Sequence, residues 1–281
     1  DLLSEYTKKH VTVALSGDGA DELFSGYNKH AAEYAARKKG VLSQIVRTGV
    51  PLWRILPQSR NGKLSNKFRQ LNRFADGMGL SDADRYWQWA SITNEKDALN
   101  LLVLSPDIQE YTDRKKEILS QLSKNSSFNN VLYTDLKLVL QSDMLVKVDL
   151  MSMDHALEVR TPFLDYTVVD FVSQLPVDYK INAGVRKRIL QETYRPMLPE
   201  AIFNRKKHGF EVPLLKWFQT DLRSMITDDL LSEALIVQQN IFNPQAIGEL
   251  KYRLFSSNPG DAAAKVWALI VFQHWWKKYI C

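Results

Sequence analysis

The chain has 281 residues, of which 45% are hydrophobic and 25% charged, a balance typical of a globular protein in water. Its longest apolar run near the C-terminal end, residues 266–272, is too short to span a bilayer, and no signal peptide is visible, so no membrane partner is predicted. The net charge is +5, but the short basic clusters fall at presumed helix ends, so no nucleic-acid partner is predicted. The single cysteine, Cys281, excludes an internal disulfide framework and favours a reducing cytoplasm.

The first element is an apolar, β-branched run at residues 11–15, which predicts a short buried strand. It ends in SGDG at residues 16–19, where two glycines permit a tight turn. Asp18, Asp21 and Glu22 converge on this turn as a helix begins. Three acids suit a hard divalent cation that itself carries phosphate oxygens. The alternative is a strand-to-helix turn whose carboxylates only cap the helix.

After this turn the pattern is overwhelmingly helical. Ser81 heads one segment as a capping box, and Asp165 is expected to cap another. A lone parallel strand cannot satisfy its backbone groups, so further strands are expected outside these residues. The predicted helical segments are 21–39, 63–75, 81–92, 106–124, 130–157, 165–174, 185–197, 214–227, 244–256 and 262–279.

Three sequence blocks, in the same order, resemble the synthetase domain of glutamine-dependent asparagine synthetases. The first reads VTVALSGDGADELFSGY at residues 11–27, and the second reads DMLVKVDLMSMDHALEVRTPFLD at residues 143–165. The third consists of RKRILQ at 186–191, LPE at 198–200 and NRKKHGFEVP at 204–213. The chain departs from the family pattern at Leu150, where the family has Arg, at Ser25, where it has Gly, and at Glu211, where it has a small residue.

The resemblance implies an α/β parent fold of the PP-loop ATP-pyrophosphatase type, a doubly wound parallel sheet, of which this chain would form a mostly α-helical part with one or two strands. Residues 1–281 are then the C-terminal portion of a single synthetase domain. The SGGxDS loop that holds pyrophosphate in the family does not occur in these residues, and neither does the glutaminase domain. The chain alone is therefore expected to be inactive.

The resemblance also implies the chemistry: ATP adenylates the side-chain carboxylate of aspartate, and ammonia derived from glutamine then displaces AMP. Asp21 matches the acid that ligates Mg²⁺, and Glu22 lies beside it. Asp18 matches the acid near the reacting carboxyl, and the hypothesis is that it manages the proton of ammonia. Lys187 matches the lysine that stabilises charge in both half-reactions. From the residues alone, Lys187 would be an exposed lysine at a helix start.

Nucleotide contacts are expected from Ser16, Gly17, Gly19 and Arg205, the last in a loop that would close over phosphates. The implied protein is cytoplasmic, uses ATP and Mg²⁺, and is compatible with a homodimer. Two alternatives stay open. One is a related PP-loop enzyme that forms an amide on another carboxylate, as β-lactam synthetases do. The other is a non-catalytic helical binding module that keeps the glycine turn as a remnant.

Overall fold

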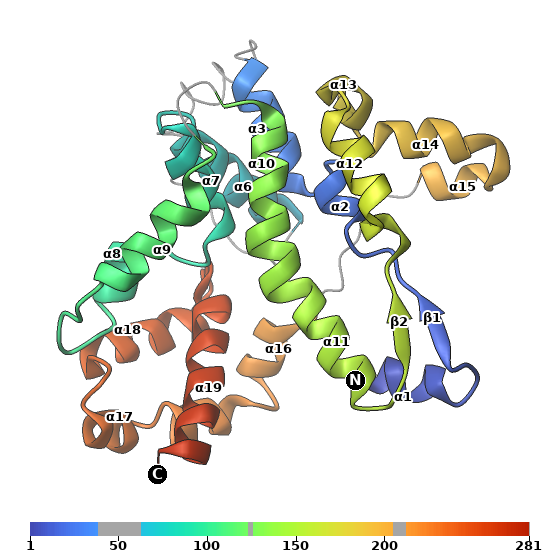
Figure 1. Ribbon diagram of the computed structural model, residues 1–281. Helices are drawn as coiled ribbons and strands as arrows, with labels where there is room; N and C mark the ends of the chain where they lie inside the picture. The colour runs from blue at the N-terminus through green and yellow to red at the C-terminus, as the bar shows by residue number, and fades with distance from the viewer. Residues whose placement is uncertain (39–62, 123–125, 205–211, 281) are drawn as a thin grey trace. The chain divides into compact units, whose positions relative to one another are not determined.

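The computed structural model describes residues 1–38, 63–122, 126–204 and 212–280, which form mostly helices and few strands (Figure 1). A mostly helical chain is confirmed, although the described residues hold four short strands rather than one or two. The chain divides into two compact units. The first holds the described residues of 1–40, 81–86 and 109–206, and the second those of 41–80, 87–108 and 207–281.

The predicted strand is β1, Val13–Leu15, and it pairs in parallel with β2, Glu158–Arg160, which the sequence did not predict. The backbone N–H of Ser16 extends the pairing by donating to the Arg160 carbonyl at 2.8 Å. The expectation of a buried strand is wrong, because Leu15 is 74% exposed. Among the described residues β1 pairs with β2 alone, so its side chains lack the neighbouring strands that help to bury a central parallel strand.

The single helix predicted over residues 21–39 is instead two helices, α2, Ala20–Leu23, and α3, Asn28–Lys38. Ser25 has a left-handed backbone with a φ of 61°, which a right-handed helix cannot contain. The backbone N–H of Gly26 donates to the Asp21 carbonyl at 2.8 Å and closes the turn. Gly26 is a poor helix former, but a single glycine within a helical pattern is tolerated, so the sequence pattern does not predict a break.

The long helical region predicted over residues 130–157 consists of α10, Phe128–Asp135, and α11, Leu145–Met153, joined by a π-helical segment, Leu136–Met144. π-helical hydrogen bonding is rare and occurs often at functional sites. Within the first unit, α10 lies against α2 and α3. This packing connects the turn after β1 to the longest helical segment of the unit.

Asp165 caps α12, Tyr166–Gln174, as predicted: its Oδ1 accepts a hydrogen bond from the Thr167 backbone N–H at 2.9 Å. The chain then forms α13, Val177–Lys180, and a hairpin of two strands. The helix expected from residue 185 begins later, because residues 185 and 186 are the second strand of this hairpin. The hairpin and the helices after it are β3, Ile181–Asn182; β4, Val185–Arg186; α14, Arg188–Tyr194; and α15, Glu200–Phe203.

Helices with clear local signals lie near their predicted bounds, namely α6, Lys63–Gly77; α7, Asp82–Ala90; α9, Gln109–Leu119; α18, Pro244–Phe255; and α19, Ala262–Tyr279. The Ser81 hydroxyl accepts a hydrogen bond from the Asp84 backbone N–H at 3.1 Å, as the capping box requires. The helices that the sequence did not predict are α1, Leu2–Lys8; α8, Glu95–Leu99; and α17, Glu233–Gln239, together with α13 and α15.

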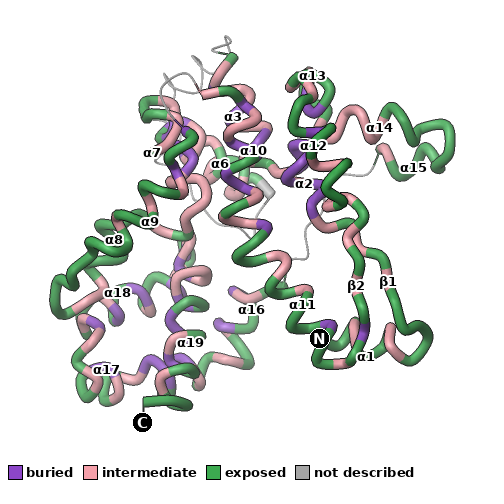
Figure 2. Tube along the Cα trace, in the orientation of Figure 1, coloured by how far each residue is buried: buried purple, intermediate pink, exposed green. Residues whose placement is uncertain are grey.

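The second unit has its core around α18 and α19, where buried residues line the facing sides of the helices (Figure 2). Phe218, Leu254 and Val266 are fully buried there. The helix predicted over 214–227 ends early as α16, Leu214–Gln219, and a π-helical segment, Met225–Leu230, follows it. No helix in the described part of the chain is both long and apolar enough to cross a membrane.

Candidate functional site

The turn after β1 is built around two short-range constraints. The Ser16 hydroxyl donates a hydrogen bond to the Asp18 carboxylate, which fixes that carboxylate against the turn. Gly19 has a φ of 87°, a conformation that favours glycine. A Cβ at Gly19 would also lie 2.3 Å from Leu164 Cδ2, so any larger residue would clash. By contrast, a Cβ at Gly17 would meet nothing within 4 Å, which leaves the backbone open on that side.

The structure brings Asp21 and Lys187 together. Lys187 Nζ lies 3.1 Å from Asp21 Oδ1, and the two side chains are 31% and 26% exposed. Gly26 makes this pairing possible, because a Cβ there would lie 1.7 Å from Asp21 Oδ1 and 2.4 Å from Lys187 Cε. The partly exposed ion pair is thus accessible to a ligand. The side of the pair that faces Gly26 is closely packed against the turn between α2 and α3.

Backbone contacts position Lys187 as firmly as its ion pair does. Its φ is 52°, and its N–H donates to the Phe24 carbonyl at 3.1 Å. The neighbouring Arg186 donates from Nη1 to the Gly26 carbonyl at 3.0 Å and to Asn28 Oδ1 at 2.6 Å. The end of the β3–β4 hairpin is therefore joined to the α2–α3 turn by hydrogen bonds from Arg186 and from the Lys187 backbone. The sequence prediction did not include Arg186 in the site.

Glu22 has a different environment from Asp21. Its side chain is buried, with 1% exposure, and Oε1 accepts a hydrogen bond from the Tyr27 hydroxyl at 2.5 Å. Burial, the hydrogen bond to Glu22 and the nearby carboxylates raise the pKa of Tyr27 far above its ordinary value of 10.0. Tyr27 therefore stays protonated and donates to Glu22. The role of Glu22 as a metal ligand stays a prediction, and so do the roles of the other site residues.

The described residues show no ready-made metal cluster at the turn. Three acidic or histidine side chains converge only at Asp1, Asp154 and His155 in the described part of the chain, away from Asp21 and Glu22. Asp21 still offers an accessible oxygen ligand of the kind Mg²⁺ prefers. Arg205, the remaining predicted site residue, lies outside the described residues.

A buried polar network supports the site from α10. Asp135 is fully buried and accepts hydrogen bonds from Lys29 Nζ at 2.6 Å, from His30 Nε2 at 2.6 Å and from the Tyr86 hydroxyl. Burial alone would raise the pKa of Asp135, but the His30 hydrogen bond and the Lys29 charge outweigh it and lower the pKa below 3.8. The network joins the start of α3 to the end of α10, and it could not be inferred from the motifs.

The turn that carries Ser16, Asp18 and Asp21 thus follows the carboxyl end of β1, a strand paired in parallel with β2. A family model described as asparagine synthase matches residues 2–277, so the chain belongs to the asparagine synthase family. The motif-based resemblance is thereby confirmed at the level of the family.

Curated relatives agree with the family. The chain is 30% identical to a protein of Bacillus subtilis (strain 168) named asparagine synthetase [glutamine-hydrolyzing] 1, over 98% of this chain and 42% of the relative. It is 28% identical to a putative asparagine synthetase [glutamine-hydrolyzing] of Mycobacterium tuberculosis (strain H37Rv), over 98% of this chain and 40% of the relative. The chain thus spans about two fifths of the length of these relatives. No solved structure matched the chain significantly.

Proposed function

We propose that this chain forms part of an ATP-dependent asparagine synthetase, within a doubly wound parallel sheet of the PP-loop type. The full-length protein would adenylate the aspartate side-chain carboxylate and then amidate it with ammonia from glutamine, releasing AMP and pyrophosphate. One observation carries the proposal: the 3.1 Å contact between Asp21 and Lys187 joins two of the three sequence blocks at one accessible point. A remnant turn in a binding module would not require Gly26 to be packed against both side chains.

In this proposal each residue has a distinct task. Asp21 would hold Mg²⁺, which when bound neutralises charge on the phosphates of ATP. Lys187 would place a positive charge beside the phosphate at which the aspartate carboxylate attacks. Asp18, held by Ser16, would accept the proton that ammonia loses on attack. The open backbone at Gly17 would leave room for the nucleotide, and Gly19 would form the turn that brings this backbone to it.

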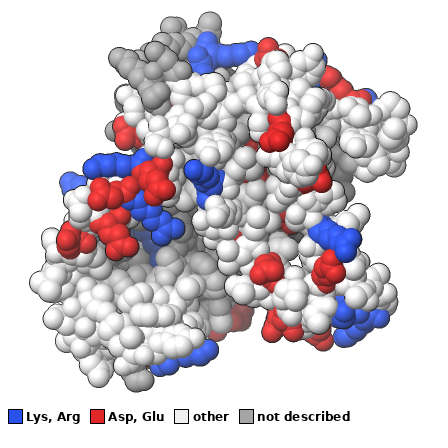
Figure 3. All heavy atoms as spheres, in the orientation of Figure 1, with Lys and Arg blue, Asp and Glu red and all other residues white. Residues whose placement is uncertain are grey.

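The proposed partners are small molecules: aspartate, ATP and glutamine as the source of ammonia. We place the reaction in the cytoplasm, where ATP is available, and a homodimer is compatible with it. In the described residues on the face shown in Figure 3, acidic and basic side chains are interspersed rather than gathered into one basic patch.

The test is ATP–pyrophosphate exchange by the full-length protein, with Mg²⁺ and aspartate. We expect exchange in the wild type and its loss, by a factor of about 100 or more, in Asp21→Asn and in Lys187→Met, because both remove charge from the reacting centre. Lys265→Met is the matched control, since it breaks an ion pair of similar length, 3.0 Å to Asp97, in the second unit. Exchange that requires a carboxylic acid other than aspartate would assign the chain to a different amide-forming enzyme.

A further inference from the structure

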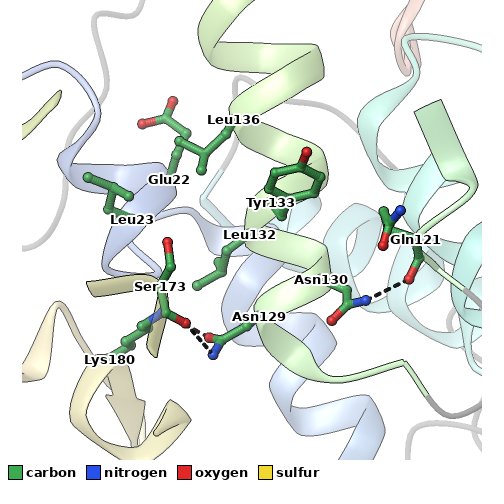
Figure 4. A pocket seen from close by; sticks show the side chains of 10 residues that line it. All are labelled: Glu22, Leu23, Gln121, Asn129, Asn130, Leu132, Tyr133, Leu136, Ser173 and Lys180. Atoms are coloured by element: carbon green, nitrogen blue, oxygen red, sulfur yellow. Dashed lines mark hydrogen bonds between the residues drawn. The ribbon is translucent and has the colours of Figure 1, made fainter. Parts of the chain in front are cut away.

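A second polar site lies in the first unit, in a pocket of about 300 Å³ beneath α2 (Figure 4). Residues of α2, α10, α12 and α13 line it. Its lining includes Leu23 and Leu132, which lie between two charged side chains, Glu22 and Lys180, in Figure 4. We name it the Lys180 pocket.

Lys180 is the unusual member of this lining. Its residue exposure is only 2%, and Nζ donates one hydrogen bond, to Asn129 Oδ1 at 2.9 Å. The Asn129 amide nitrogen is held by the carbonyls of Ser173 and Leu175, both at 3.2 Å, which fixes its oxygen toward the lysine. Among the described residues no carboxylate forms an ion pair with Lys180, although an ammonium group has three hydrogens to donate.

A buried charge without a counter-ion is costly, and proteins normally pair it. Burial lowers the pKa of Lys180 to about 8, so most molecules keep the proton at neutral pH. The pocket therefore offers a fixed cation with donors to spare, next to empty volume. An anionic group of a small ligand would supply the missing partner and would form a charge-assisted hydrogen bond.

The rest of the lining restricts which ligand fits. The buried carboxylate of Glu22 would repel a second negative charge, so a phosphate or a dicarboxylate is disfavoured. One cation and one anion in the lining match a ligand with no net charge but with separated charges. The leucines between them favour a small aliphatic group.

We propose that the Lys180 pocket binds a small, net-neutral α-amino acid, whose carboxylate pairs with Lys180 Nζ and whose side chain lies against the leucines. This site is distinct from the Asp21–Lys187 pair, and Glu22, which follows Asp21 on α2, lies in its wall. The proposal does not depend on the proposed activity, because binding requires neither ATP nor Mg²⁺.

The test is calorimetric titration of the full-length protein with L-valine, in the absence of ATP, Mg²⁺ and glutamine. We expect saturable binding that weakens at least tenfold in Lys180→Met, because the charged partner of the carboxylate is lost. Lys265→Met, which removes a lysine from the second unit, is the matched control and should bind L-valine as the wild type does. Equal affinity of the wild type and Lys180→Met, or no binding by the wild type, would overturn the proposal.

A comparison of ligands on the wild type keeps the test decisive should Lys180→Met fail to fold. L-Valinamide, which lacks the carboxylate, should bind at least tenfold more weakly than L-valine, and so should L-aspartate, which adds a negative charge near Glu22. If L-valinamide binds as well as L-valine, Lys180 does not recognise a carboxylate and the proposal is wrong. Failure of ATP–pyrophosphate exchange would not affect these results, so the two proposals are refuted separately.

Discussion

Substitution of Gly26 by alanine tests the central contact of the candidate site. The new Cβ would lie 1.7 Å from Asp21 Oδ1 and 2.4 Å from Lys187 Cε, whereas real Cβ contacts are almost never shorter than 3.0 Å. The Asp21 oxygen must therefore move by about 1.3 Å, the difference between 3.0 and 1.7 Å. Both clashing atoms belong to side chains that can rotate, so the ion pair separates and the fold need not change.

The expected effects on stability and activity differ in size. A partly exposed ion pair contributes about 1 kcal/mol or less, so Gly26→Ala should lower the stability by about that amount. A displacement of about 1 Å in a reacting site can reduce the rate about 100-fold. We therefore expect ATP–pyrophosphate exchange by the full-length protein to fall by about two orders of magnitude, while its thermal unfolding midpoint changes by only a few degrees.

Gly248→Ala is the control, since a Cβ there meets nothing within 4 Å and the residue is exposed in α18. It should leave exchange unchanged and stabilise the protein by about 1 kcal/mol, because alanine favours a helix over glycine. The reasoning fails if Gly26→Ala keeps exchange within about threefold of the wild type, since a 1 Å displacement should cost far more.

Three further predictions concern buried groups. The pKa of Asp135 is lower in the folded protein than in the unfolded chain, where it is about 3.9, so the ionised carboxylate stabilises the fold above that pH. This stabilisation is lost as the pH falls from the unfolded pKa through the folded one. Asp135→Asn should therefore weaken the dependence of the unfolding free energy on pH in the acid range, as measured by urea titration. Tyr27→Phe leaves the buried Glu22 carboxylate without its donor and should lower the unfolding free energy by about 1–3 kcal/mol in urea titration. Ser25→Gly relieves a left-handed backbone and removes a buried hydroxyl that has no partner among the described residues. The unfolding free energy should therefore increase by roughly 0.5–1 kcal/mol, which thermal unfolding would show as a higher midpoint.

The sequence predicted those elements whose signals are local. Ser81 and Asp165 start helices because their side chains accept hydrogen bonds from backbone groups two or three residues later, and these contacts are present. The pairing of β1 with β2 depends on residues far apart in the chain, and β2, Glu158–Arg160, was missed because its three residues include two charged ones and form no apolar run. The break at Ser25 was missed for a related reason, since contacts with the distant β3–β4 hairpin accompany it.

The same distinction applies to the candidate site. Motifs selected Asp21 and Lys187 one by one, but their contact follows from how the hairpin meets the α2–α3 turn. Arg186 was not selected, because an arginine beside a lysine at an expected helix start has an ordinary explanation at the surface. Only the structure shows its guanidinium on the Gly26 carbonyl. The Asp135 network was missed for the same reason, since its members come from three separate helices.

Backbone strain gives the candidate site more weight than the ion pair alone. Partly exposed pairs are common and contribute little, so a 3.1 Å contact by itself does not define a site. Three of the five non-glycine residues with positive φ in the described chain, Ser25, Ala183 and Lys187, lie in the turn and the hairpin that meet there. Such conformations persist only where surrounding contacts enforce them, and they cluster at functional sites. The strain at Lys187 is maintained by its N–H bond to Phe24, which holds the amine beside Asp21 before any ligand arrives.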